Sequence, residues 1–164
     1  MSSERESTDR TMTGRCLCGE VTFETSGAPD KVFVCYCRFC QRLTGGICLV
    51  EPIFGCDKVR FRGPPLRTYD YVSPVHGRVL KVHACPECGT RLALSLERSG
   101  FKTYGMFGGT FDEPGELRPD RHIFTSAAPP WVVFPSDVNC YAEHSAQPDG
   151  TPLVPWQDAG TVPL

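Results

Sequence analysis

Apolar and polar residues alternate along most of the middle of the chain, with the period of two that is typical of β-strands. Glycine and proline separate nearly all of these segments, as they do in turns. No window of helical length keeps an apolar stripe, and only residues 38–43 predict a single helical turn. The pattern therefore predicts a mainly β fold with little helix. The predicted strands are residues 21–23, 31–34, 47–50, 59–61, 66–71, 78–84, 91–96 and 101–107.

The two ends of the chain lack this alternation. Residues 1–12 are polar and charged, which predicts a disordered leader. Residues 145–164 are rich in proline and glycine, and they predict either a disordered tail or an extended arm anchored by Leu153 and Trp156. No linker or internal repeat interrupts the region between them, so we expect one domain over residues 13–144.

Charge and hydropathy exclude several classes of protein. The formal net charge is −2, with acidic and basic residues mixed, which argues against nucleic-acid binding through bulk electrostatics. No apolar run approaches the roughly 20 residues of a membrane helix, and the polar first residues do not resemble a signal peptide. We therefore expect a cytoplasmic protein, in which clustered cysteines bind metal more often than they form disulfides.

Cysteine gives the strongest functional signal. The chain has ten cysteines, and most of them fall into three short clusters. The clusters are C-L-C-G at 16–19, C-Y-C-R-F-C at 35–40 and C-P-E-C-G at 85–89. Such spacing is typical of metal sites, since each cluster can direct several thiolates to one centre.

The C-P-E-C-G cluster predicts a tight turn that supplies two zinc ligands, with Gly89 free to take a positive φ. A closed zinc site then needs two more ligands. Cys16 and Cys18 are two residues apart and face the same side of an extended segment, so they are good candidates. Spacing alone equally permits Cys35 and Cys37.

Either pairing uses four of the seven clustered cysteines and leaves three. A structural zinc site uses four protein ligands, whereas a catalytic one keeps three and an open position. A zinc held by Cys35, Cys37 and Cys40 would carry a water or a substrate thiol, and a coordinated thiol loses its proton. If His83 or Cys48 supplied a fourth ligand, the site would be closed and structural instead.

The order of the motifs extends the pattern beyond the cysteines. G-R-C-L-C-G-E-V-T-F, C-Y-C-R-F-C-Q-R-L-T-G-G and C-P-E-C-G-T-R-L are followed by G-G-T-F-D-E-P, P-D-R-H-I-F and P-P-W. Over about residues 13–135 the chain resembles the glutathione-dependent formaldehyde-activating enzyme family, which includes centromere protein V-like proteins. The resemblance implies a β-tent fold of small antiparallel sheets held together by zinc.

The resemblance also implies ligands and chemistry. The implied ligands are Cys16, Cys18, Cys85 and Cys88 for a structural zinc, and Cys35, Cys37 and Cys40 for an open one. The chemistry associated with the family joins glutathione and formaldehyde as S-(hydroxymethyl)glutathione, or reverses that reaction. We therefore expect a zinc-dependent carbon–sulfur lyase with a small thiol and an aldehyde as partners.

One residue departs from the family pattern, because Tyr36 stands where histidine is common. Its side chain should point away from the metal, so we expect zinc binding to survive and glutathione specificity to change. Arg38 and Arg78 could pair with substrate carboxylates, and a solvated surface arginine is the simpler interpretation of each. Trp131, after Pro129 and Pro130, could form a pocket wall, although the residue type favours core packing. His122 matches a family position, and a structural hydrogen bond is its simpler role.

Two other functions compete with this hypothesis. The first is a zinc-containing binding module without turnover, whose second site is closed or empty. The second is a methionine sulfoxide reductase of the B type, but only Cys140 is near the required position and its surroundings, D-V-N-C-Y-A, match poorly. The sequence shows no Ser-His-Asp arrangement and no carboxylate pair for acid–base catalysis. Homo-oligomerisation is compatible with each function.

Overall fold

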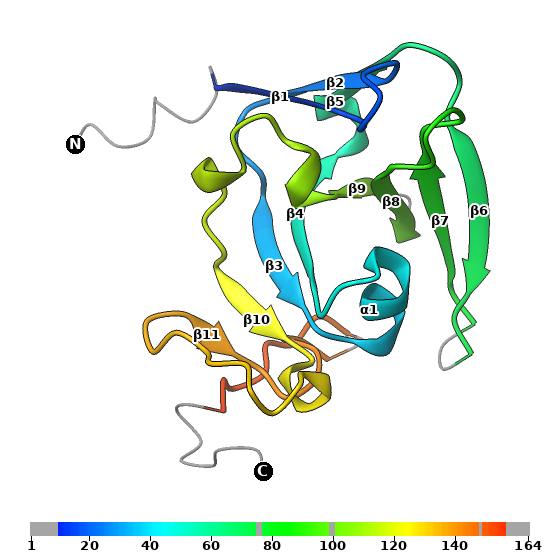
Figure 1. The fold of residues 1–164 in the computed structure, drawn as a ribbon. Helices are drawn as coiled ribbons and strands as arrows, with labels where there is room; N and C mark the ends of the chain where they lie inside the picture. Colours follow the sequence, from blue (N-terminus) through cyan, green and yellow to red (C-terminus); the bar gives the residue numbers. More distant parts are fainter. Residues whose placement is uncertain (1–9, 75–76, 99–100, 148, 157–164) are drawn as a thin grey trace. The chain divides into compact units, whose positions relative to one another are not determined.

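The computed structural model describes residues 10–74, 77–98, 101–147 and 149–156 (Figure 1). Contacts divide the chain into two compact units. The first unit comprises Met1–Asp30 and Pro52–Leu117, and the second comprises Lys31–Glu51 and Arg118–Leu164. Each unit contains one of the metal-ligating clusters predicted from the sequence.

The first unit contains a three-stranded antiparallel sheet in the order β1 (Thr11–Arg15), β2 (Thr22–Ser26) and β5 (Val59–Arg62). Side chains of β1 and β2 alternate between buried and exposed, which is the reason these short segments form strands. Phe23 lies at the centre of the buried face, with its ring 4.9 Å from that of Phe111 and 6.0 Å from that of Phe61. A short 3₁₀ turn, η1 (Cys56–Lys58), leads into β5.

A second group of antiparallel strands in the same unit follows the order β9, β8, β7, β6. Phe54, Leu92 and Met106 are fully buried in this unit, so the strands that carry them have an apolar face. Residues 53–55 at the end of β4 pair with β9. The bounds are β4 (Leu49–Gly55), β6 (Arg67–Val72), β7 (Val79–Ala84), β8 (Arg91–Arg98) and β9 (Phe101–Met106), followed by the 3₁₀ turns η2 (Gly108–Thr110) and η3 (Pro114–Glu116).

The second unit is built on parallel pairing. Strand β10 (Arg121–Ile123) pairs with β3 (Lys31–Cys35) and with β11 (Asn139–Cys140), both in parallel. The helix α1 (Arg38–Thr44) follows β3 directly, and the 3₁₀ turn η4 (Thr125–Ala127) follows β10. Consequently Cys35 ends a strand that is hydrogen-bonded in place, only a few residues before a helix.

The C-terminal segment is fixed to this second unit as far as Trp156. The backbone N–H of Trp156 donates to the carbonyl of Cys140 at 2.9 Å, and its indole Nε1 donates to Thr125 Oγ1 at 3.1 Å. Leu153 N donates to the carbonyl of Ser145 at 3.0 Å. The described part of residues 145–164 therefore packs on this unit, and it folds back on itself at a bridge between Ala146 and Pro152.

The predicted fold class is confirmed: the described residues are mainly β, in small sheets, with a single α-helix. Strands β1, β10 and β11 were not predicted from the sequence. Strand β1 starts at Thr11, inside the expected leader, whose residues 1–9 lie outside the described part. The helix is one residue longer than predicted and ends at Thr44, with Gly45 as its C-cap, where a φ of 72° suits glycine.

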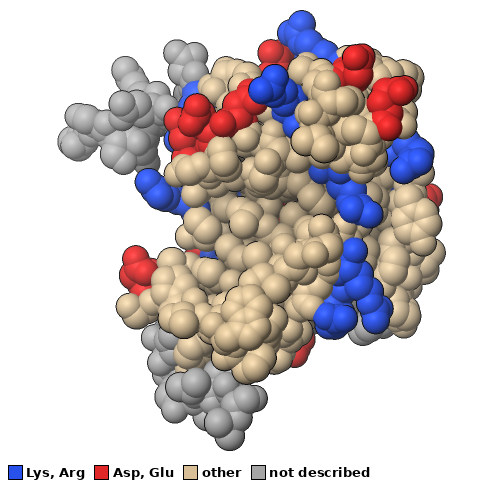
Figure 2. Space-filling model, viewed as in Figure 1, with Lys and Arg blue, Asp and Glu red and all other residues tan. Residues whose placement is uncertain are grey.

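The surface carries both acidic and basic side chains. Over the β1, β2 and β5 sheet, acidic and basic side chains alternate on the face shown in Figure 2. Arg15 pairs with Asp112, and Glu24 pairs with both Arg60 and Arg62. Within the described ranges, no helix has the length and apolar character to span a bilayer.

Candidate metal centres

Four cysteines converge in the first unit. The sulfur ligand atoms of Cys16, Cys18, Cys85 and Cys88 all lie within 4.8 Å of one another. The Cys16 and Cys18 sulfurs are 3.4 Å apart, and those of Cys18 and Cys85 are 3.8 Å apart. A tetrahedral zinc with bonds of about 2.3 Å separates its sulfurs by about 3.8 Å, so the thiols fit a tetrahedral ion of that size.

Two turns create this arrangement. Cys16 follows β1, and Gly19 with φ 84° bends the chain back so that Val21 N donates to Cys16 Sγ at 3.3 Å. Cys85 follows β7, and Gly89 with φ 74° closes its turn by donating its N–H to the carbonyl of Cys85 at 3.1 Å. Both glycines take the positive φ that other residues avoid, which explains their place beside the cysteines.

Thr90 connects the two turns. Its hydroxyl accepts a hydrogen bond from Leu17 N at 3.1 Å and contacts Cys88 Sγ at 3.1 Å. The hydrogen bond with Thr90 helps lower the pKa of Cys88 to about 5, so that the thiolate is favoured at neutral pH. A deprotonated thiol is the form that binds metal, and the turn is therefore prepared for a cation.

Three cysteines converge in the second unit. The sulfurs of Cys35, Cys37 and Cys40 lie within 4.8 Å of one another. Cys35 ends β3, Cys37 is the N-cap of α1, and Cys40 lies in the first turn of that helix. Cys35 and Cys40 are buried whereas Cys37 is partly accessible, so any approach from solvent reaches Cys37 first.

Electrostatics place the negative charge of this cluster on Cys37. Hydrogen bonds from the thiols of Cys35 and Cys40 lower its pKa to about 3, and the backbone N–H of Cys40 adds to this effect at 3.4 Å. The same contacts, together with burial, raise the pKa of Cys40, and the neighbouring Cys37 raises that of Cys35. A bound cation would replace these protons, because metal coordination needs thiolates.

The described residues bring no fourth donor into this cluster. Cys48, a candidate fourth ligand, is half-buried in the same unit but lies outside the group. His83, the other candidate, belongs to the first unit and its Nε2 hydrogen-bonds to Ser95 Oγ at 2.7 Å. The donor set observed is thus three sulfurs, with soft character suited to zinc.

Glu51 is a neighbour of the cluster that sequence reasoning missed. It lies in β4 and is half-buried. Burial and the negative charge of Cys37 raise its pKa to about 7, and its own charge helps raise the pKa of Cys40. The available signal was a lone acid inside the apolar segment L-V-E-P-I-F.

Tyr36 points into the packed interior of the second unit. Its hydroxyl lies 3.1 Å from His122 Nδ1, the two rings stack, and Phe134 packs edge-on against both. Tyr36 and His122 are both buried. His122 has the structural hydrogen bond that was its simpler predicted role.

Replacing Tyr36 by phenylalanine should therefore destabilise the protein by about 1–2 kcal/mol, because His122 Nδ1 would lose its partner inside the core. Chemical denaturation measures the free energy of unfolding. Tyr69→Phe, at an exposed tyrosine, is the matched control and should change it by less than about 0.5 kcal/mol. Equal effects of the two changes would refute this interpretation of Tyr36.

The predicted substrate-binding residues lie in different settings. Arg38 is exposed in the first turn of α1 and donates to Gln41 Oε1. Gln41 in turn donates to the carbonyls of Tyr36 and Ala127, at 2.6 and 2.9 Å.

The other two predicted residues are also exposed. Arg78 is exposed before β7 and belongs to the first unit. Trp131 is 68% exposed, so its alternative role in core packing is wrong. Substrate binding by Arg38, Arg78 and Trp131 stays a prediction.

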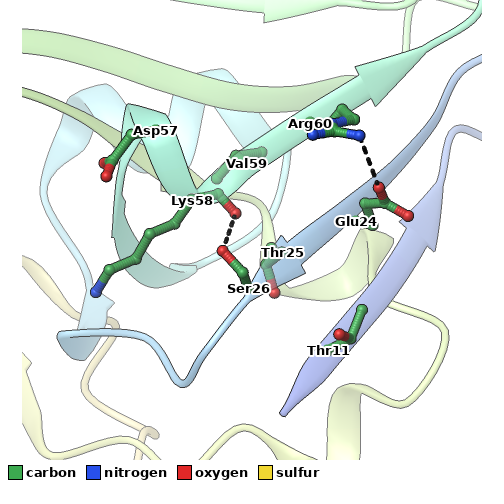
Figure 3. Close-up of a pocket in the computed structure, with 8 residues that line it drawn as sticks. All are labelled: Thr11, Glu24, Thr25, Ser26, Asp57, Lys58, Val59 and Arg60. Carbon is green, nitrogen blue, oxygen red and sulfur yellow. Dashed lines mark hydrogen bonds and ion pairs between the residues drawn. The ribbon is translucent and has the colours of Figure 1, made fainter. Parts of the chain in front are cut away.

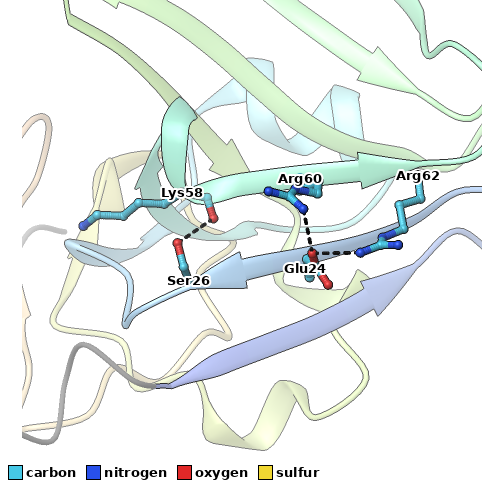
Figure 4. Close-up of polar contacts among 5 residues, drawn as sticks. All are labelled: Glu24, Ser26, Lys58, Arg60 and Arg62. Atoms are coloured by element: carbon cyan, nitrogen blue, oxygen red, sulfur yellow. Dashed lines mark hydrogen bonds and ion pairs between the residues drawn. The ribbon is translucent and has the colours of Figure 1, made fainter.

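The first unit also has a polar pocket of about 320 Å³ beside β2 and β5, and no cysteine lines it (Figure 3). Three of its charged groups are paired: Glu24 with Arg60 at 3.9 Å and with Arg62 at 3.1 Å, as Figure 4 shows, and Lys58 with Asp30 at 2.9 Å. Ser26 Oγ donates to the carbonyl of Lys58 at 3.5 Å. These contacts explain most of the polar side chains of the pocket as structural.

Comparison with known proteins agrees with the cysteine pattern. Residues 11–127 match the family model of the glutathione-dependent formaldehyde-activating enzyme. Among solved structures, a Rhodobacter sphaeroides protein is similar, with 21% sequence identity, a TM-score of 0.48, and coverage of 66% of this chain and 92% of that one. No curated protein gave a significant match. The family match spans most of the chain, and this protein therefore belongs to the glutathione-dependent formaldehyde-activating enzyme family.

Proposed function

We propose that the protein is a zinc-dependent carbon–sulfur lyase that joins a small thiol to an aldehyde, or cleaves such an adduct. The observation that carries this proposal is the cluster of three thiols, which the described residues do not complete with a fourth donor. Family membership supports glutathione and formaldehyde as the first substrates to test. The four-cysteine cluster of the first unit is proposed to hold a structural zinc.

A zinc ion on Cys35, Cys37 and Cys40 would supply a vacant position that binds the substrate thiol and favours its thiolate form. In the forward reaction the thiolate sulfur bonds to the carbonyl carbon, and the carbonyl electron pair moves to oxygen. That oxygen takes up a proton, so the S–H proton of the thiol is balanced by the O–H of the product. The reverse reaction breaks the carbon–sulfur bond and returns the proton.

The residues around the cluster can assist each part of this reaction. Partial exposure of Cys37 opens the cluster to a substrate thiol. Arg38, directly after Cys37 and exposed, offers a guanidinium group for a substrate carboxylate. Glu51 interacts electrostatically with Cys37 and Cys40, and its raised pKa suits a group that exchanges protons near neutral pH. These roles support a thiol that carries a carboxylate.

Replacing Glu51 by glutamine should lower turnover about a hundredfold or more if its carboxylate accepts the thiol proton. Because a base acts when deprotonated, the wild-type rate should rise as the pH passes through the pKa of Glu51, which burial raises above its ordinary value. The Glu51→Gln enzyme should lack that rise. Glu143→Gln, at an exposed acid of the same unit, is the control and should behave as wild type. Identical pH profiles in all three proteins would exclude Glu51 from proton transfer.

A direct experiment tests the proposed function. The zinc-loaded protein is mixed with glutathione and formaldehyde, and exchange between free and adduct forms is followed by NMR against the uncatalysed rate. In a parallel sample cobalt replaces zinc, and glutathione is titrated while the visible spectrum is recorded. Faster exchange and a spectral change on thiol binding are expected. Absence of both would reject the lyase.

One observation favours a second candidate function, recognition of a partner without turnover. The second unit exposes large apolar side chains, with Trp131 68%, Val133 91% and Val154 69% exposed. A binding module of this kind predicts one tightly held zinc per chain, whereas the lyase predicts two. The free state of all ten cysteines supports a reducing compartment such as the cytoplasm for either function.

A further inference from the structure

Strand β6 forms an open edge of the first unit. It ends the order β9, β8, β7, β6, and no described strand pairs with its outer side (Figure 1). On its inner side all of Arg67–Val72 pairs in regular register with β7. Its outer backbone N–H and C=O groups therefore form a template on which another strand can pair.

This edge has only part of the usual protection against pairing: Arg67 and Asp70 are charged, but other blocking features are absent. Every residue of β6 except Tyr71 is exposed, and the sequence R-T-Y-D-Y-V consists mostly of residues that favour strands. It contains no proline, lysine or bulge, the features that normally block an edge. The charge of Asp70 is already partnered by Lys81 of β7 at 2.5 Å.

We propose that β6 pairs with β6 of a second copy of this chain, antiparallel about a two-fold axis at Tyr69. In this register Tyr69 lies opposite the partner's Tyr69, which gives an aromatic pair across the axis. Thr68 lies opposite the partner's Asp70, so a hydroxyl donor faces a carboxylate acceptor on both sides of the axis. The side chains of the strand therefore complement their own copies.

The neighbouring registers are less favourable. A shift of two residues in one direction places Asp70 opposite the partner's Asp70, where like charges repel. A shift in the other direction places Leu66 opposite the partner's Asp70, an apolar group against a charge. Charge therefore selects the register, and the complementarity of the strand to its own copy indicates a second chain as the occupant. Two short strands bury little surface compared with the roughly 1,200–2,000 Å² of a stable interface, so the dimer forms reversibly as concentration rises.

Sedimentation velocity over a range of protein concentration tests this proposal. Wild type should pass from monomer to dimer, and both Tyr69→Lys and Tyr69→Glu should weaken dimerisation about tenfold or more, because each places like charges on the axis. An equimolar mixture of these two variants should associate again, since lysine then faces glutamate. Val133→Lys, at a 91% exposed site of the other unit, is the matched control and should dimerise like wild type.

Hydrogen exchange provides a second measurement on unaltered protein. The outward amides of β6 should exchange more slowly as wild type becomes dimeric. A wild type that stays monomeric, as expected if another segment or a foreign peptide covers the edge, overturns the proposal. Dimerisation of Tyr69→Lys at wild-type strength also overturns it, because the interface would then lie elsewhere. Neither result bears on zinc binding or turnover.

Discussion

Replacement of Cys37 by serine is expected to remove metal from the second unit and to lower turnover by at least about a hundredfold. Cys37 is the most accessible thiol of its cluster, and its pKa of about 3 makes it the first thiolate available to a cation. A loss of this size is a conservative estimate, because changes to residues that merely support metal ligands cost about 10–100-fold. Metal content by mass spectrometry and adduct exchange by NMR measure the two effects.

The matched control is Cys48→Ser. Cys48 is also half-buried in the second unit but lies outside the cluster, so its replacement should leave metal content and turnover close to wild type. If both variants lose metal, Cys48 is a ligand and the site is closed. If neither loses metal or activity, the three-cysteine cluster has no role in catalysis.

The second large effect is on folding. Replacement of Cys85 by serine is expected to lower the free energy of unfolding by more than about 4 kcal/mol, or to prevent folding of the first unit, since structural metal sites contribute their binding energy to folding. Cys85 is fully buried at the end of β7, and its backbone N–H donates to the carbonyl of Thr90 at 2.9 Å. Loss of the metal would therefore release the turn and the strands that lead into it.

Chemical denaturation with and without a chelator measures this contribution. Cys56→Ser changes a half-buried thiol of the same unit that belongs to no cluster, and it should cost less than about 1 kcal/mol. Chelation should reduce wild type to the stability of Cys85→Ser and have little further effect on that variant. Equal stability of the two cysteine variants would show that the four-cysteine site does not hold the fold together.

Most strands and the three-cysteine cluster were predictable because each depends on local sequence, whereas the four-cysteine cluster joins two distant pairs that spacing alone could not assign. Alternation locates strands such as β7 and β8, and close spacing brings Cys35, Cys37 and Cys40 together on one turn. Strands β10 and β11 were missed because they have three and two residues, too few to show a period. Strand β10 pairs with β3, which is distant in sequence, and β11 pairs with β10.

The surroundings of the clusters were harder to predict. Glu51 lies on a separate strand, so only folding brings it under the influence of Cys37. Its raised pKa depends on burial, which the sequence does not reveal. Trp131 shows the opposite error, because an aromatic residue after two prolines suggested packing whereas the side chain is exposed. In each case the sequence does not reveal which other segments of the same chain lie beside the residue.

Anomalous diffraction at the zinc edge, from a crystal soaked in glutathione, would show how the seven clustered cysteine sulfurs are divided between two metal ions. Two zinc peaks per chain are expected, one within the four-cysteine cluster and one beside Cys35, Cys37 and Cys40 with the glutathione sulfur as its fourth ligand. A single peak, a disulfide among the three cysteines, or a protein side chain in that fourth position would contradict it.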